Sequence, residues 1–189
     1  MVSRLRNLVL SLLIFASPTF AAEVAGVKID DQTRVGNTEL ALTGAGLRKR
    51  VFFQVYAIGL YVQDRKADPV SQPGPKRVQI HMLRDVGAEQ FIEALADGIK
   101  TNHSEAEAKA LESRVRQLGA IMAEVKEAKK GLSIALDWTG KDTQVMIDSK
   151  PAGRPIEGED FYRALLRIWL GDKPVQDDLK KALLGAASQ

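Results

Sequence analysis

Hydrophobic and polar positions alternate along the first part of the chain, a pattern typical of strands. Between 77 and 83, Val78, Ile80 and Met82 share one face, and polar residues occupy the other. Similar segments lie at 23–29, 38–43 and 48–62, separated by turn-rich sequence at 30–37 and a proline-rich loop at 64–76. The pattern predicts four strands before any helix.

The apolar spacing then changes to the three-to-four rhythm of helices. Phe91, Leu95 and Ile99 recur every four residues, which places them on one side of a helix over 88–102. Ser104 and Glu107 form a capping-box start for a second helix, whose apolar stripe from Leu111 to Val125 continues for about four turns. These segments predict a helix pair whose apolar sides face the core.

The last third combines a hairpin with two further helices. Two alternating segments, 132–139 and 143–148, flank a tight turn, and 149–160 reads as a loop. Helices are expected at 161–171 and 175–185, each ending with a glycine. Because strands and helices do not alternate and no internal repeat occurs, the order predicts one α+β domain, an antiparallel β-sheet backed by helices.

The first 21 residues have the features of a secretory signal peptide. A short basic region is followed by an apolar run at 8–16 that is too short to span a bilayer, and Thr19 and Ala21 are the small residues before a cut. We expect cleavage after Ala21, a mature domain of 22–189 and no membrane span after signal removal. The alternative is an uncleaved anchor. The chain has no cysteine, which favours the bacterial periplasm over a disulfide-rich secreted class.

Charge and motifs exclude several function classes. The formal charge of +3 falls by two, to +1, when the leader with Arg4 and Arg6 is removed, so nucleic acid is not an expected partner. Two histidines without paired spacing and no cysteine argue against a metal site, and we expect no cofactor. The sequence 44–46, Gly-Ala-Gly, leads into a strand rather than a helix, so we interpret it as a flexible turn that allows close backbone approach.

The segment 44–62, GAGLRKRVFFQVYAIGLYV, resembles a motif of the chalcone-isomerase fold, in which a G-x-G-x-R turn precedes an F-x-x-x-x-A-I-G-x-Y strand. The resemblance continues through 83–95, 104–112 and 161–185, and it is nearest to the bacterial exported chalcone isomerase-like branch. It implies an open-faced β-sandwich with a ligand cleft between sheet and helices. Plant enzymes of this fold cyclise a chalcone, and plastid relatives bind fatty acids.

The resemblance also implies roles for individual residues. Arg48 matches the arginine that contacts the ligand, and Tyr56 matches a position that is threonine in the enzymes and tyrosine in the fatty-acid binders. Phe91 and Gly98 match the catalytic tyrosine and asparagine of the enzymes, and neither can donate a side-chain hydrogen bond. No catalytic residue is therefore assigned, and isomerase activity is in doubt.

Strand geometry adds a third candidate, because residues two apart share a face. Gln54 and Tyr56 should lie on the same side of the strand as Ile58, Leu60 and Val62. A phenol and an amide within an apolar wall suit a ligand with one polar end and a long apolar body. We therefore predict Arg48, Tyr56 and Gln54 as ligand-binding residues for a fatty acid or similar amphipathic carboxylate.

Alternatives to this hypothesis stay open at the level of sequence. Tyr56 could be a core tyrosine bonded to a backbone carbonyl, with Arg48 paired to an acid such as Asp85. The protein could instead be a chalcone isomerase-type intramolecular lyase, or an interaction module of the envelope that holds no ligand. Oligomeric state is not predicted.

Overall fold

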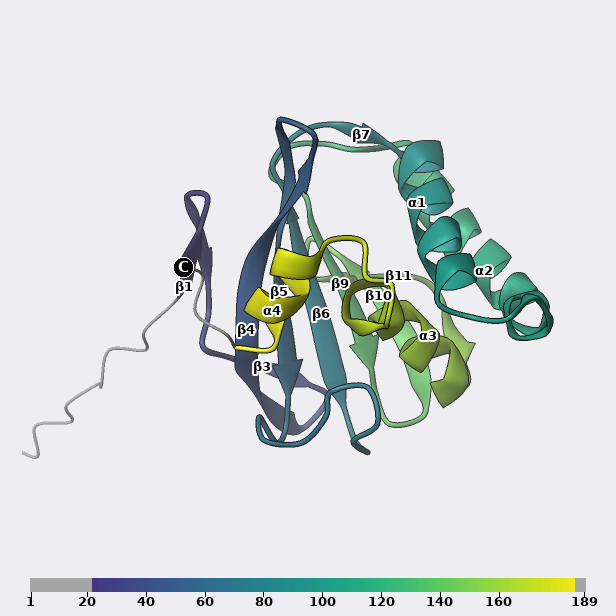
Figure 1. Ribbon diagram of the computed structural model, residues 1–189, viewed down its shortest axis with the longest axis horizontal. Coiled ribbons are helices and arrows are strands. Elements are labelled where there is room, and N and C mark those ends of the chain that lie inside the picture. The colour runs from purple at the N-terminus through teal and green to yellow at the C-terminus, as the bar shows by residue number, and fades with distance from the viewer. Residues whose placement is uncertain (1–21, 186–189) are drawn as a thin grey trace, which may run out of the picture.

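The computed structural model describes residues 22–185, which form an antiparallel sheet covered by helices (Figure 1). Seven strands follow the order β11-β10-β9-β6-β5-β4-β3. Their bounds are β3 (Gln32–Val35), β4 (Thr38–Arg50), β5 (Phe53–Val62), β6 (Lys76–Met82), β9 (Ser133–Trp138), β10 (Asp142–Ile147) and β11 (Lys150–Glu157). Two small hairpins add β1 (Ala22–Val24) with β2 (Val27–Ile29), and β7 (Val86–Gly87) with β8 (Glu127–Ala128). The predicted α+β class is confirmed.

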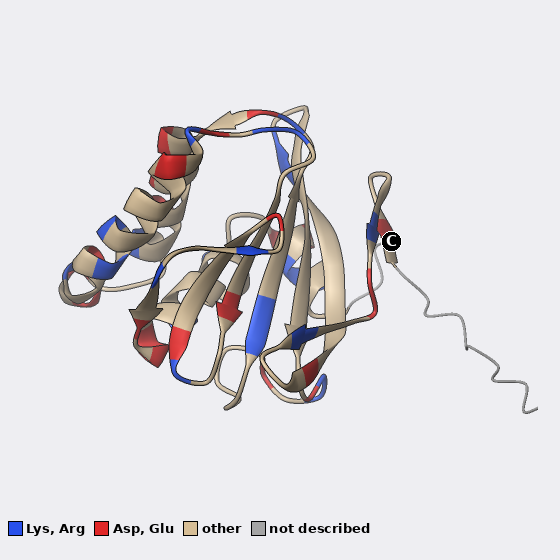
Figure 2. Ribbon diagram, turned by 180° about the vertical axis from the view of Figure 1, so that it is seen from behind, with Lys and Arg blue, Asp and Glu red and all other residues tan. Residues whose placement is uncertain are grey.

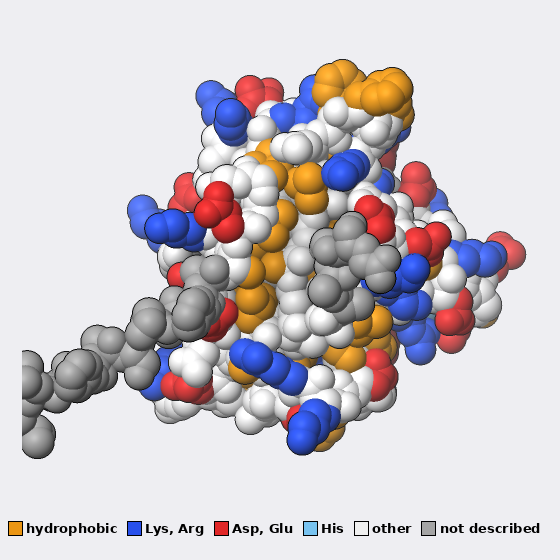
Figure 3. Space-filling model, turned by 60° about the vertical axis from the view of Figure 1, so that its left-hand side comes forward, with side chains coloured by type: hydrophobic (Ala, Val, Ile, Leu, Met, Phe, Trp, Pro, Cys, Tyr) orange, Lys and Arg blue, Asp and Glu red, His pale blue; other side chains and the backbone are white. Residues whose placement is uncertain are grey.

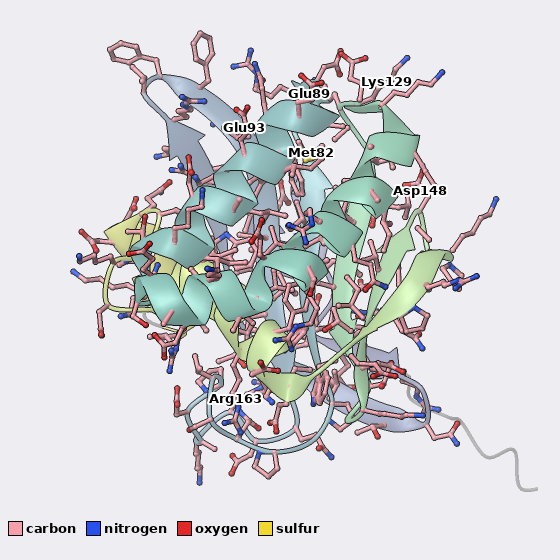
Figure 4. All side chains as sticks on the ribbon, turned by 90° about the vertical axis from the view of Figure 1, so that its right-hand side faces the viewer. Met82, Glu89, Glu93, Lys129, Asp148 and Arg163 are labelled. Atoms are coloured by element: carbon pink, nitrogen blue, oxygen red, sulfur yellow. The ribbon has the colours of Figure 1, made fainter. Side chains whose placement is uncertain are left out.

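Three helices cover one face of the sheet, and a fourth packs on β4. They are α1 (Ala88–Thr101), α2 (Glu105–Val125), α3 (Glu159–Leu170) and α4 (Asp177–Leu183). From the helical side, α1 and α2 lie in front of the sheet and Met82 lies behind them (Figure 4). The predicted capping box is present, because the Ser104 hydroxyl accepts from the Glu107 amide and the Glu107 carboxylate accepts from the Ser104 amide. This start fixes where α2 begins.

The main core fills the space between the helices and the inner face of the sheet. Alternate residues of the two central strands face it, as the hydrophobic pattern predicts: Ile58, Leu60, Val62, Val78, Ile80 and Met82. On the outer face, Ala57 and Tyr61 join a smaller cluster under the β1–β2 hairpin. Strand β5 therefore places its two faces in different clusters, as the period of two requires.

One ion pair is buried on the outer face. Arg77 of β6 and Asp137 of β9 are directly opposite each other, and the guanidinium donates from Nε and Nη2 to the two carboxylate oxygens at 2.6 Å each. Only 17% of the Arg77 side chain and 5% of the Asp137 side chain are exposed. Figure 2 views the sheet from behind the view of Figure 1, with Lys and Arg in blue and Asp and Glu in red. The pair therefore links β6 and β9 in a largely dehydrated setting.

The prediction of four strands before the first helix is wrong, because seven strands precede α1 among the described residues. The segment 23–29 folds into the β1–β2 hairpin, and the turn-rich segment 30–37 contains β3, since only Gly36 and Asn37 form the turn before β4.

Two further predictions for turns and loops are wrong. The segment 149–160 contains β11, which pairs with β10 at the end of the sheet. Pro151 and Pro155 made it look like a loop, but an edge strand tolerates proline because one side needs no ladder hydrogen bonds. The Gly-Ala-Gly of 44–46 lies inside β4, and the actual turn before β5 is Val51 and Phe52.

The predicted signal peptide, residues 1–21, lies outside the described residues. Between Ala22 and Gly185 no helix combines the length and hydrophobicity needed to cross a bilayer.

Candidate ligand-binding cleft

A cavity of about 850 Å³ opens between the start of β5, helix α1 and the end of α3. This volume is within the range of small-molecule sites. Apolar side chains form much of the wall, among them Val55, Phe91, Leu95, Ile168 and Trp169. Two of the three predicted site residues, Arg48 and Tyr56, also line it. Charged side chains of both signs line it too, namely Arg50, Arg84, Asp85, Glu93, Asp97 and Lys173. The fold thus brings an arginine and a phenol to one cavity whose wall is partly apolar and partly charged.

Tyr56 reaches the cleft because β5 points it toward the helices. Its side chain is buried, and its hydroxyl oxygen accepts a hydrogen bond from Trp169 Nε1 at 2.9 Å. Burial raises the pKa of Tyr56, opposed by the Trp169 hydrogen bond and the charge of Arg48, so the phenol is protonated at neutral pH. Among residues 22–185 its own O–H has no acceptor, which leaves a donor available to a ligand.

Arg48 carries a positive charge without a carboxylate partner in the described part of the chain. Its Nη1 donates to the Lys49 carbonyl at 2.6 Å and to Gln176 Oε1 at 3.2 Å. Gln176 also accepts from the Lys49 amide at 2.8 Å and donates to the Leu47 carbonyl at 3.0 Å. It therefore holds both the strand and the arginine, while the rest of the guanidinium remains available for an anion.

The two glycines before Arg48 make this contact possible. Gly44, Gly46 and Arg48 are two residues apart on β4, so they share a face. A Cβ at Gly46 would lie 2.6 Å from Leu179 Cδ1, and one at Gly44 would lie 2.8 Å from the Leu183 carbonyl oxygen. The predicted close approach is confirmed, and its partner is α4. The glycines allow α4 to rest on the strand, and Gln176 at its start then meets Arg48.

Gln54 does not join this group. In the ladder between β4 and β5, Arg48 lies opposite Tyr56 and Lys49 lies opposite Gln54. Val55 therefore has no opposite residue on β4 and is the extra residue of a β-bulge. The bulge interrupts the alternation: Val55 and Tyr56 both line the cleft, whereas Gln54 is exposed outside it. The expectation that Gln54 and Tyr56 share a face is therefore wrong, and the reason is a register shift that has no local sequence signal.

The contacts proposed as alternatives are also not those observed. Asp85 accepts a hydrogen bond from the Lys130 amide at 2.7 Å rather than pairing with Arg48. The Tyr56 hydroxyl meets the Trp169 indole rather than a backbone carbonyl. Sequence reasoning missed the roles of Trp169 and Gln176, which lie 113 and 128 positions from Tyr56 and Arg48.

Phe91 and Gly98 line the same cavity, as the family alignment implies. Phe91 is 6% exposed and supplies only an apolar ring. A Cβ at Gly98 would lie 2.8 Å from Ile168 Cγ2, so this glycine allows α1 and α3 to pack closely. Neither position offers a hydrogen-bond donor side chain to a ligand. Residues 22–185 contain no group of three side chains suited to hold a metal ion.

Comparisons with known proteins agree with this architecture. Curated protein sequences give no match. Among solved structures, the crystal structure of a fatty-acid binding protein of Arabidopsis thaliana is similar, with a TM-score of 0.66 and 15% sequence identity. The match covers 84% of this chain and 92% of that one. The family model described as chalcone isomerase-like matches residues 21–185. This chain belongs to the chalcone isomerase-like family.

Proposed function

We propose that this protein binds a fatty acid or a similar amphipathic carboxylate in the cleft without transforming it. The observation that supports this most directly is that two groups line one cavity with an apolar stretch of wall: Arg48, a cation without a carboxylate partner among the described residues, and Tyr56, whose O–H has no acceptor there. A carboxylate accepts from both groups, and an acyl chain suits the apolar wall. The structural neighbour described as a fatty-acid binding protein is consistent with this choice.

The apolar wall and the polar groups Arg48 and Tyr56 contribute different amounts to the binding free energy. Burying a hydrocarbon chain contributes about 0.8 kcal/mol per CH₂, or on the order of 10 kcal/mol for a dozen, before the costs of association. A charge-assisted hydrogen bond from Arg48 adds roughly 1.5–3 kcal/mol. The cavity therefore sets the affinity, and Arg48 with Tyr56 sets which end of the ligand faces the β4 side.

Binding rather than cyclisation is favoured by the side chains opposite this pair. By the family resemblance, Phe91 and Gly98 match the positions of the hydrogen-bonding tyrosine and asparagine of the enzymes, and both line the cleft here. The cleft can hold a polar head group at Arg48. Phe91 and Gly98, however, have no side-chain donor that could polarise another group of a substrate.

A head-group comparison tests the proposal. Delipidated protein should bind palmitate more tightly than hexadecanol, because only the carboxylate pairs with Arg48. Arg48→Gln should weaken palmitate binding by about tenfold to a hundredfold and leave hexadecanol binding nearly unchanged. Titration of a displaced fluorescent acyl probe measures both constants, and native mass spectrometry shows whether an acyl ligand co-purifies.

Arg34→Gln serves as the control, because Arg34 is an exposed arginine on β3 paired with Glu39. It should change neither constant. Equal losses for palmitate and hexadecanol in Arg48→Gln would contradict a head-group role. Failure of the wild-type protein to bind either compound would contradict the proposed function.

We also propose that the protein is exported to the periplasm and that the leader is removed after Ala21. The basic, apolar and small-residue regions of 1–21 support this. N-terminal sequencing of the protein recovered from a periplasmic extract should start at Ala22. An intact Met1 on protein from the soluble cell interior would contradict it.

A further inference from the structure

The turn between β4 and β5 exposes three consecutive large hydrophobic side chains. Val51 is 79% exposed, Phe52 is 94% exposed and Phe53 is 59% exposed. Figure 3 shows hydrophobic side chains gathered at this end of the molecule. We call these three residues the hairpin tip. Water-exposed apolar residues are ordinary when scattered, but a contiguous group at a protruding turn indicates an interaction site.

The tip also departs from normal turn chemistry. Arg50 pairs with Phe53, so Val51 and Phe52 form a two-residue turn. Such turns favour glycine, asparagine or aspartate, because a central residue takes positive φ. Here Val51, a β-branched residue, has φ of +56°. Backbone geometry disfavours valine here, and burial does not account for it, so the local fold does not explain a Val-Phe turn.

Cations surround the hairpin tip. Lys49, Arg50 and Arg84 are exposed, and none forms an ion pair within residues 22–185. The Arg84 guanidinium carbon lies 4.5 Å from the centre of the Phe53 ring, so this cation sits directly beside the apolar group. The neighbouring acid Asp85 is engaged by the Lys130 amide.

Charges of both signs occur farther along the same end of the molecule. Figure 4 shows Glu89 and Lys129 there, away from the tip itself. The cations Lys49, Arg50 and Arg84 flank the tip, and the acids Asp85 and Glu93 line the cavity that Val51 and Phe53 also line.

We propose that the hairpin tip docks on the surface of a lipid bilayer that contains anionic head groups. Phenylalanine and valine side chains enter the boundary between head groups and acyl chains, and a flanking collar of Lys49, Arg50 and Arg84 contacts the phosphates. Each cation near an anionic surface strengthens binding, so the contact is reversible and weakens with salt.

Docking would also orient the cleft. Arg50, Val51 and Phe53 line the same cavity as Arg48 and Tyr56, so the hairpin tip belongs to its rim. A bilayer bound at the tip would therefore lie against the rim of the cavity, where an apolar molecule could pass between the bilayer and the cavity. Bilayer docking does not require that the cleft ligand be a fatty acid.

Vesicle sedimentation tests the docking. Full-length mature protein should sediment with vesicles of phosphatidylcholine containing phosphatidylglycerol, and much less with phosphatidylcholine alone. Replacing both Phe52 and Phe53 with serine should lower the partition coefficient by about tenfold or more. Lys49→Gln with Arg50→Gln should lower it by about fivefold per charge, and only on the anionic vesicles.

A reporter substitution tests whether the tip enters the bilayer. Phe52→Trp places an indole at a 94% exposed position, whereas Trp138 and Trp169 are 4% and 2% exposed. Its emission should shift to shorter wavelength on anionic vesicles and be quenched by lipids with brominated acyl chains. The wild-type protein, whose two tryptophans are buried, should show neither change.

Matched charge removal at another place is the control. Lys28→Gln with Arg34→Gln removes the same charge from β2 and β3 and should leave vesicle binding within about twofold. The proposal is overturned if this control loses as much binding as the tip variant, or if the indole at position 52 shows no quenching. It is also overturned if the double serine variant converts a dimer to a monomer in sedimentation, because the tip would then bind a second copy.

Discussion

Replacing Arg77 with methionine is expected to lower the free energy of unfolding by about 3–5 kcal/mol at neutral pH. The substitution keeps most of the apolar volume but leaves the Asp137 carboxylate, only 5% exposed, without its cation. It also removes the Arg77 Nη1 hydrogen bond to Thr33 Oγ1, which measures 2.6 Å. Denaturant unfolding followed by tryptophan fluorescence measures the loss.

The loss should depend on pH in a defined direction. Burial raises the pKa of Asp137, and in the wild-type protein the hydrogen bonds and charge of Arg77 oppose that rise. Without Arg77 only burial remains, so the folded-state pKa of Asp137 lies above its unfolded value of about 3.9. A raised folded pKa contributes stability that is present at low pH and lost as pH rises. The Arg77→Met defect should therefore shrink as the pH falls below the folded-state pKa of Asp137 in the variant.

Two controls separate burial from the ion pair itself. Adding Asp137→Leu to Arg77→Met should recover most of the stability, because an apolar pair in place of a buried ion pair is close to neutral. Arg114→Met breaks a similar bidentate pair, with contacts of 2.6 and 2.7 Å, but its partner Asp160 is 65% exposed. That change should cost under about 1 kcal/mol. Equal costs for Arg77→Met and Arg114→Met would contradict the burial argument.

Local patterns in the sequence predicted the elements whose cause is local. The alternation of Val78, Ile80 and Met82 reflects one face of β6, and the pairing of Ser104 with Glu107 starts α2. Each of these signals depends on residues within one or two turns or strand positions. The helix pair and the 132–148 hairpin follow in the same way.

The rest depends on partners that are distant in sequence. Gln176 lies 128 positions from Arg48, and Trp169 lies 113 from Tyr56, so neither contact has a periodic signal. The bulge at Val55 arises from pairing between β4 and β5, and this turned Gln54 away from the cleft. For the site, sequence reasoning thus placed Arg48 and Tyr56 together through the family resemblance, but it did not identify what holds them.

Replacing Gly44, the first glycine of the Gly-x-Gly-x-Arg motif, with alanine is expected to lower the free energy of unfolding strongly. A methyl group here would overlap the Ala182 carbonyl oxygen and approach the Gly185 amide, which are backbone atoms that cannot rotate away. Helix α4 must then move off β4, which exposes Leu179 and Leu183, now 1% and 2% exposed. We expect a loss of about 3 kcal/mol in unfolding free energy and faster proteolysis within α4.

Gly119→Ala is the matched control for this change. Gly119 lies inside α2, and the atom nearest to its added methyl would be Ile92 Cγ2 at 3.3 Å, part of a side chain that can shift. There, alanine should leave stability unchanged or raise it by up to about 1 kcal/mol, because it favours the helix more than glycine does. If Gly44→Ala were as stable as Gly119→Ala, the close packing of α4 on β4 would be contradicted.

Gly44→Ala should also weaken palmitate binding under conditions in which the variant is folded, because displaced α4 takes Gln176 away from Arg48. Gln176→Ala isolates this step, since it removes the 3.2 Å contact to Arg48 without a steric overlap. It should reduce palmitate affinity in the same direction with a smaller cost in stability, and it should spare hexadecanol. A loss confined to Gly44→Ala would mean that α4 shapes the cleft wall rather than the head-group site. A loss shared by both variants would show that the glycines act by bringing Gln176 to Arg48.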